Sequence, residues 1–187
     1  KAICAPARET IQTGKFSHMN GHKDNRTPFD TAQYLFPKQL QKGGYQTALV
    51  GKWHLQTLPA GFDFWEILPG QGQYYRPRFI SMKKDTVAYP NAYATSLTTD
   101  KAINWLNHRD AAKPFMLMVN HKAPHRNWWP EYQHALRFSK INIPEPPSLY
   151  ADTAGKGKAY REQQMRILED MTLGTDLKID PAYYDDI

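Results

Sequence analysis

Apolar residues in this chain gather in short runs, which alternate with polar segments rich in Gly and Pro. Residues 115–119 form a continuous apolar run, a pattern that is typical of a strand buried on both faces of a parallel sheet. Residues 45–50 form a second, β-prone run, which we expect to stop at Gly51. The pattern therefore predicts two strands that are separated by about a third of the chain.

Other segments carry helical signals, and we predict helices over residues 5–13, 31–42, 95–109 and 158–173. The first has Pro6 in its opening turn and Gly14 directly after its end. Pro37 is expected to kink the second helix or to delay its start. Ser96 or Thr98 is expected to cap the third. The order helix–strand–helix–strand favours an α/β fold with a mostly parallel central sheet flanked by helices.

The remaining segments are rich in turn-forming residues. We interpret residues 15–30 and the Pro-rich residues 141–155 as loops. Residues 52–92 are interpreted as a long irregular excursion, and such segments within compact domains usually carry function. Ligands of parallel sheets bind at the carboxyl ends of the strands, so the residues that follow each predicted strand are candidates for a site.

Composition bounds the kind of protein. The 187 residues suit one domain or a piece of a larger one, and 24 Lys and Arg against 18 Asp and Glu give a net charge of +6. This balance fits nucleic acid, an anionic surface or a sulfated or phosphorylated substrate, and it fits equally a soluble protein that happens to be basic. The cations are dispersed along the chain, which argues against a nucleic-acid-binding arm.

Several simple features exclude other classes. One cysteine excludes an internal disulfide framework and a zinc site of several thiolates. No run of about 18 apolar residues occurs, so no membrane span is expected. The first residues form no charged-then-apolar leader, so we expect a signal peptide to be absent or to lie outside this chain. Asn25-Arg26-Thr27 matches a glycosylation sequon, a pattern that often arises by chance.

The single cysteine, Cys4, stands at the start of the first predicted helix. A helix N-terminus attracts anions and favours a reactive thiolate. Arg8 follows four residues later, on the same helix face, and adds positive charge. The alternative is a buried cysteine that packs as a small hydrophobic residue.

Two cationic clusters directly follow the predicted strands. In an extended segment Lys52 and His54 would point the same way, where they could hold an anion and move a proton. Residues 121–126 contain two His, a Lys and an Arg, and loops at strand ends often carry function. A solvated Lys beside a capping His, and an ordinary surface loop, are the alternatives. Together with Cys4 these residues describe a pocket for a divalent anion.

Three motifs, in this order, resemble the type I, formylglycine-dependent sulfatases. CAPAR at residues 4–8, with Thr13-Gly14, resembles the signature C-x-P-x-R followed by T-G. GKWHL at 51–55 matches the second signature, and HKAPH at 121–125 resembles the third, H-x-P-H. Residues 69–75, PGQGQYY, are similar to the subgroup that acts on 6-sulfated N-acetylglucosamine. The likeness covers essentially the whole chain.

The resemblance implies an alkaline-phosphatase-like fold and a sulfuric ester hydrolase with five catalytic residues. A maturing enzyme would oxidise Cys4 to formylglycine, which would act as the nucleophile. Arg8 would steady this group, and Lys52 would bind the sulfate oxygens. His54 would take a proton as sulfate leaves, and His125 would protonate the sugar oxygen.

The resemblance also implies a sulfated substrate and a metal. Lys122 and Arg126 would bind the substrate, a sulfated glycan of the kind found in glycosaminoglycan degradation. The family binds calcium, and Cys4, as formylglycine, would be the ligand from this chain, with the remaining ligands outside it. We therefore expect residues 1–187 to be part of an N-terminal catalytic domain, incomplete at both ends and inactive alone. A periplasmic, secreted or lysosomal-type location is expected.

Two alternatives remain beside this interpretation. The same superfamily contains hydrolases of phosphodiesters and phosphonate monoesters, some of which also use formylglycine. An inactive fragment that binds polyanions would fit the positive charge and the absence of the metal-ligand motifs from the sequence.

Overall fold

The computed structural model describes residues 3–167, 169–172 and 175–176. It divides into two compact units, Lys1–Ala123 and Pro124–Ile187, and each is described by itself. None of the helices within the described residues is long and apolar enough to cross a membrane.

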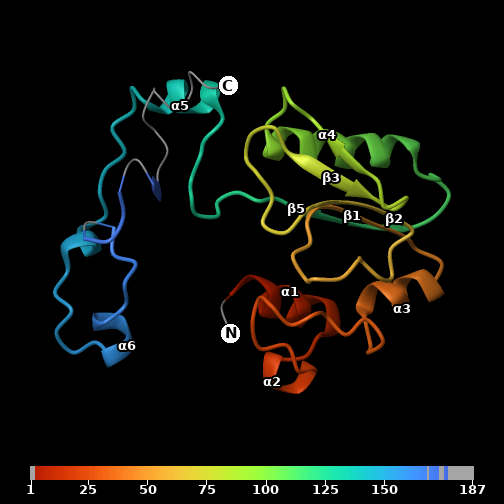
Figure 1. Ribbon diagram of the computed structural model, residues 1–187, viewed down its shortest axis with the longest axis horizontal. Coiled ribbons are helices and arrows are strands. Elements are labelled where there is room, and N and C mark those ends of the chain that lie inside the picture. The colour runs from red at the N-terminus through yellow and green to blue at the C-terminus, as the bar shows by residue number, and fades with distance from the viewer. Residues whose placement is uncertain (1–2, 168, 173–174, 177–187) are drawn as a thin grey trace. The chain divides into compact units, whose positions relative to one another are not determined.

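The first unit contains a five-stranded sheet in the order β4-β3-β2-β1-β5 (Figure 1). Strand β1 (Gln46–Lys52) pairs in parallel with β5 (Phe115–Asn120) and with β2 (Phe64–Leu68). Strands β3 (Arg78–Ser81) and β4 (Thr86–Ala88) extend the sheet in the antiparallel sense. The α/β fold is confirmed, and β2, β1 and β5 form the parallel part of a mixed sheet.

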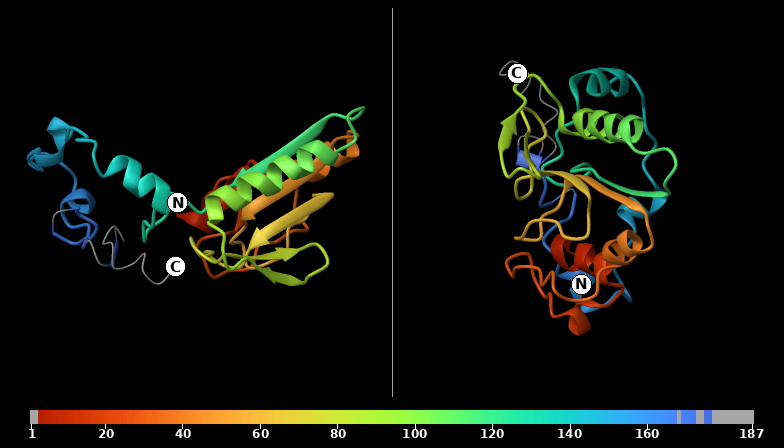
Figure 2. Two further views of the ribbon diagram at one scale, coloured as in Figure 1. Left: turned by 90° about the horizontal axis from the view of Figure 1, so that it is seen from above. Right: turned by 90° about the vertical axis from the view of Figure 1, so that its right-hand side faces the viewer.

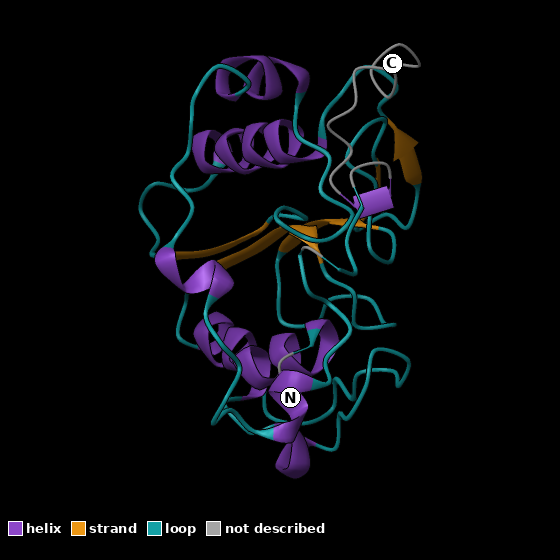
Figure 3. Ribbon diagram, turned by 90° about the vertical axis from the view of Figure 1, so that its left-hand side faces the viewer, coloured by secondary structure: helices purple, strands orange, loops and turns teal. Residues whose placement is uncertain are grey.

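Helices cover both faces of this sheet (Figures 2 and 3). Helix α4 (Ala94–His108) packs on β5 and β1 from one side. On the other side α3 (Phe36–Lys42) packs on β1, and α1 (Cys4–Thr13) packs on α3 and on the short α2 (Ser17–Asn20). Residues 15–30 are thus not loop throughout, because they contain α2.

The alternation of side chains along β1 divides the core between the two faces. Leu49 belongs to the larger cluster, with Trp53 and Trp65. Val50 belongs to the smaller one, which also contains Phe79 and has Leu97 of α4 packed against it. Buried apolar area on both faces therefore fixes β1, and with it the residues at its carboxyl end.

The predicted helix ends are confirmed in two places and wrong in a third. Helix α1 ends at Thr13 and is capped by Gly14, whose φ of 68° is left-handed and whose N–H donates to the Thr10 carbonyl oxygen. Helix α3 begins only at Phe36, because Pro37 suits its first turn. Neither Ser96 nor Thr98 caps α4, because both lie inside the helix, whose N-cap is Tyr93. The Thr98 hydroxyl donates to the Ala94 carbonyl oxygen within the helix.

The two predicted strands exist, with differences at their ends. Strand β1 does not stop at Gly51 but continues to Lys52. A side chain at Gly51 would place its Cβ 2.2 Å from the Asn120 carbonyl oxygen, so glycine permits the close pairing with β5. Strand β5 is not fully buried as expected: among the described residues it lies at the edge of the sheet, and Phe115 is 41% and Val119 38% exposed.

The second unit has little regular structure. It contains α5 (Tyr132–Phe138), the 3-10 helix η1 (Pro147–Tyr150) and α6 (Lys158–Arg161), none of which buries a residue. Of the helix predicted over 158–173, only the first turn forms among the described residues, so the prediction is wrong beyond that turn. Positions 168 and 173 lie outside the described residues. Apart from η1, residues 141–155 form the expected loop.

Candidate active site

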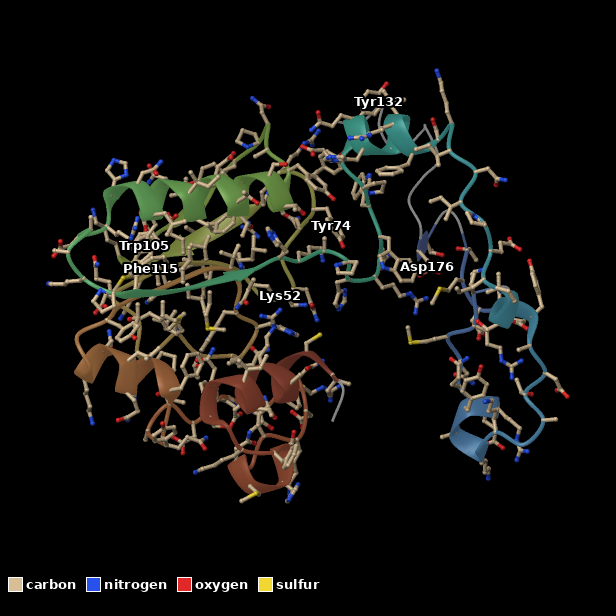
Figure 4. The ribbon with its side chains drawn as sticks, turned by 180° about the vertical axis from the view of Figure 1, so that it is seen from behind. Lys52, Tyr74, Trp105, Phe115, Tyr132 and Asp176 are labelled. Carbon is tan, nitrogen blue, oxygen red and sulfur yellow. The ribbon has the colours of Figure 1, made fainter. Side chains whose placement is uncertain are left out.

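Cys4 and Lys52 meet where α1 begins and β1 ends. The Lys52 ammonium nitrogen (Nζ) lies 3.8 Å from the Cys4 sulfur. Arg8, one turn along α1, donates from Nη1 to the Lys52 carbonyl oxygen at 2.7 Å. Figure 4 shows Lys52 and Tyr74 toward one end of the sheet, away from the end where Trp105 meets Phe115. The structure thus brings together three of the residues predicted for the site.

The start of α1 is held by a loop residue. The helix has Ile3 at its N-cap position, and no side chain there caps it. Instead the Ala5 backbone N–H donates to Oδ1 of Asn25 at 2.9 Å. Ala5 itself is fully buried in the core. Packing and this hydrogen bond together fix the first turn of α1, which carries Cys4.

A glutamine that the sequence analysis did not select joins the site. Lys52 donates from Nζ to the side-chain oxygen of Gln71. Lys122 donates from its own Nζ to the Gln71 main-chain oxygen at 3.4 Å and lies 4.7 Å from the centre of the Tyr74 ring. The signal that could have found Gln71 is its place between Gly70 and Gly72, both with positive φ.

The site is a buried group of cations. Lys52 is 2% and Lys122 9% exposed. Burial lowers the pKa of Lys52. The neighbouring Cys4 opposes this shift, whereas the positive charges of Arg8 and Lys122 lower the pKa further. Burial likewise lowers the pKa of Lys122 and of Arg8. Such a group is stabilised by an incoming anion, which would supply the missing negative charge.

His54 lies two residues beyond β1 and is 8% exposed. Its φ of 54° is left-handed, so the segment is not extended at His54. The expectation that Lys52 and His54 point the same way from an extended segment is therefore wrong. His54 lines a pocket of about 280 Å³ together with Leu58, Leu68 and Pro69. The part assigned to His54 in the chemistry stays a prediction.

His125 and Arg126 belong to the second unit, whereas Lys122 belongs to the first. Within its unit Arg126 donates from Nε to Asp176, which is 2% exposed. This hydrogen bond to Asp176 raises the pKa of Arg126. His125 contacts the Arg126 carbonyl oxygen through Nδ1. Their predicted roles in catalysis and substrate binding stay predictions.

Among the described residues, the surroundings of Cys4 hold few groups that could bind a metal ion. Within the part of the chain that the structure describes, no three His, Cys, Asp or Glu side chains gather closely enough to hold a metal ion. The Cys4 sulfur accepts a contact from the Lys52 ammonium group, which in turn donates to the amide oxygen of Gln71. These residues do not by themselves fit calcium, which prefers several carboxylate and carbonyl oxygens.

Comparison with known proteins gives a match of residues 1–181 to the family model described as Sulfatase. N-acetylglucosamine-6-O-sulfatase of Bacteroides thetaiotaomicron is 50% identical over 181 residues, which are 95% of this chain and 32% of that protein. N-acetylglucosamine-6-sulfatase of Homo sapiens is 26% identical over 162 residues, which are 73% of this chain and 29% of that protein.

The fold matches a solved structure over nearly all of the chain. A protein in complex with its substrate, D-glucosamine-2-N,6-O-disulfate, superposes with a TM-score of 0.87 at 49% identity, covering 95% of this chain and 36% of that one. The chain therefore spans about a third of the length of these relatives.

Proposed function

Since this chain belongs to the sulfatase family, we propose that it supplies the nucleophile and sulfate-binding cations of an enzyme that hydrolyses sulfate esters of a glycan. The observation that carries the proposal is the meeting of Cys4 with the buried Lys52 at the carboxyl end of β1. At this place the neighbouring cations would hold the oxygens of a sulfate group next to the nucleophile made from Cys4.

For the substrate we propose N-acetylglucosamine sulfated at its 6-hydroxyl group. Two relatives of this chain carry that activity in their names, and one of them is 50% identical. A structural relative at 49% identity binds a 6-O-sulfated glucosamine. We expect the protein to act where such glycans are degraded, in a periplasmic, secreted or lysosomal-type location.

Formylglycine made from Cys4 by a maturing enzyme would supply the nucleophile for sulfate transfer. Lys52, whose Nζ lies 3.8 Å from the Cys4 sulfur, would bind the sulfate oxygens and offset the charge that develops during transfer. Lys122 would add a second positive charge. Arg8 fixes the position of Lys52 through its carbonyl oxygen.

Two histidines would move the protons of the reaction. His125 would protonate the bridging oxygen of the sugar as it leaves, because an alkoxide is a poor leaving group. His54 would take a proton at the nucleophile as sulfate departs. Arg126 would contact the substrate. No step is assigned to calcium, because the described residues around Cys4 do not fit that ion by themselves.

The test uses the whole protein, produced with and without a formylglycine-generating enzyme. We expect release of sulfate from 6-sulfated N-acetylglucosamine only after maturation, with mass spectrometry showing formylglycine at Cys4. Cys4→Ala removes the nucleophile and should abolish this activity. A parallel assay with a phosphodiester separates the alternative hydrolase. Faster turnover of the phosphodiester, or full sulfate release by Cys4→Ala, would overturn the proposal.

A further inference from the structure

Gln71 contacts both lysines of the candidate site, through two different atoms. Its side-chain oxygen accepts a hydrogen bond from Lys52 Nζ. Its main-chain oxygen accepts from Lys122 Nζ at 3.4 Å. Two ammonium groups that would otherwise repel each other are thus tied to one residue of the loop between β2 and β3.

The backbone of this loop is built to present Gln71. Gly70 and Gly72 have φ values of 53° and 70°, in the left-handed region that favours glycine. The Gly72 N–H closes a turn onto the Pro69 carbonyl oxygen at 2.9 Å. A Cβ at Gly72 would lie 2.9 Å from Cδ1 of the buried Leu68, so the turn packs directly against the end of β2. Gln71 is therefore held in place before any ligand binds.

The number of donors on an ammonium group decides what this contact does. Lys52 Nζ has three N–H donors, which can rotate together about the last bond of the side chain. In the unmodified chain the hydrogen bond to Gln71 and the contact with the Cys4 sulfur use two of them. After maturation a formylglycine oxygen would take the place of the sulfur. Because the directions of two N–H bonds are then fixed, the direction of the third is fixed as well, and this third donor can bind an anion beside Cys4.

The amide suits this task better than a carboxylate would. A neutral oxygen orients the ammonium group and leaves its charge available to a sulfate group. A carboxylate at the same place would form an ion pair with Lys52 and cancel part of the attraction.

We propose that Gln71 is a positioning residue for sulfate transfer: its side-chain oxygen aims the Lys52 ammonium group, while its main-chain oxygen holds Lys122 beside it. This inference rests on the proposed sulfatase activity. It also explains why a glutamine stands between two glycines at this end of the sheet.

The experiment compares two substitutions of similar length in the matured whole protein, with 6-sulfated N-acetylglucosamine as substrate. Gln71→Met keeps the bulk and removes the acceptor, so kcat should fall at least about tenfold while KM changes less than about threefold. Gln71→Glu keeps an acceptor and adds charge, so kcat should stay within about threefold while KM rises about fivefold or more. The main-chain contact with Lys122 is available in both variants.

Gln73→Met, on an exposed residue of the same loop, is the matched control and should leave kcat and KM unchanged. Should Gln71→Met fail to fold, Gln71→Asn gives the same test, because its oxygen stands one carbon short of Lys52. If kcat of Gln71→Met stays within twofold of the wild-type value, the positioning role of Gln71 is refuted while the proposed function stands. A wild-type protein that releases no sulfate would instead refute the proposed function, and this inference with it.

Discussion

At the scale of the residue, Gly51 is the point at which β1 can least accept a side chain. Its φ is 104°, and an added Cβ would lie 2.2 Å from the Asn120 carbonyl oxygen of β5. We expect Gly51→Ala to lower the free energy of unfolding by about 3 kcal/mol or more, through backbone strain and lost strand pairing. Urea denaturation followed by circular dichroism measures this change.

Gly44→Ala is the matched control for that substitution. Gly44 also has a positive φ, of 83°, but no atom lies within 4 Å of the added Cβ. Only the backbone conformation is penalised there, so a loss of about 1 kcal/mol is expected. Equal losses for both variants would show that the close approach of β1 and β5 contributes nothing.

Glu9 is a buried carboxyl group on the side of α1 that faces the core. It is 1% exposed, accepts from Gln33 Nε2 at 3.0 Å and lies 2.6 Å from His22 Nδ1. Burial raises its pKa from 4.5 to about 7, with a further rise from Asp30 and an opposing effect of the Gln33 hydrogen bond. Burial also lowers the pKa of His22.

This raised pKa predicts a dependence of stability on pH. Between pH 4.5 and about 7 the unfolded chain has lost the Glu9 proton while the folded chain keeps it, so stability falls as pH rises. Glu9→Gln removes this titration. As pH rises through this range, the free energy of unfolding of the variant should therefore increase relative to that of the wild type. A difference that is flat with pH would contradict the prediction.

Residue chemistry was the most accessible part of the site from sequence. Cys4, Lys52 and Lys122 carry distinctive groups at strand or helix ends, and the structure links them: Lys52 contacts Cys4, and both lysines contact Gln71. Gln71 itself was missed because an uncharged amide in a glycine-rich loop has no electrostatic signature. Only the folded loop shows that it faces two ammonium groups.

At the scale of the element, α1 depends on a cap that comes from outside it. Asn25 Oδ1 accepts from the Ala5 N–H at 2.9 Å, while Ile3 provides no side-chain cap. Asn25→Ala should lower the free energy of unfolding by about 1 kcal/mol, as the loss of a helix cap does. It should also reduce sulfate release by the matured whole protein, because Cys4 stands in the turn that frays.

Asn104→Ala, on the exposed face of α4, controls for the loss of an amide side chain. It should leave both stability and activity close to those of the wild type. Unchanged stability in Asn25→Ala would show that solvent caps α1 equally well. The sequon at Asn25-Arg26-Thr27 thus has a structural explanation that needs no glycan.

Element prediction succeeded where local signals agreed and failed where pairing decides. Gly14 and Pro37 marked the limits of α1 and α3 through backbone conformation alone. Strands β2, β3 and β4 lie within residues 52–92, which the density of Gly and Pro marked as irregular. Residues 64–68 become a strand because they pair with β1, a contact that no local pattern encodes.

At the scale of the whole molecule, the sheet presents β5 as a long apolar edge. Among the described residues β5 pairs with β1 alone, and both Phe115 and Val119 are more than a third exposed. Unpaired backbone groups beside exposed apolar side chains promote pairing between chains. The 187-residue chain produced alone should therefore associate at micromolar concentrations, which light scattering after size-exclusion chromatography detects.

Val119→Lys places a charge on that edge and should shift the chain toward the monomer. The matched substitution, Val87→Lys, lies on the opposite edge strand, β4, where Val87 is 42% exposed. Strand β4 is three residues long and offers few backbone groups for pairing, so this variant should associate as the wild type does. An equal effect of the two lysines would assign association to exposed apolar area in general. A monomeric wild-type chain would show that the edge of β5 does not promote association at these concentrations.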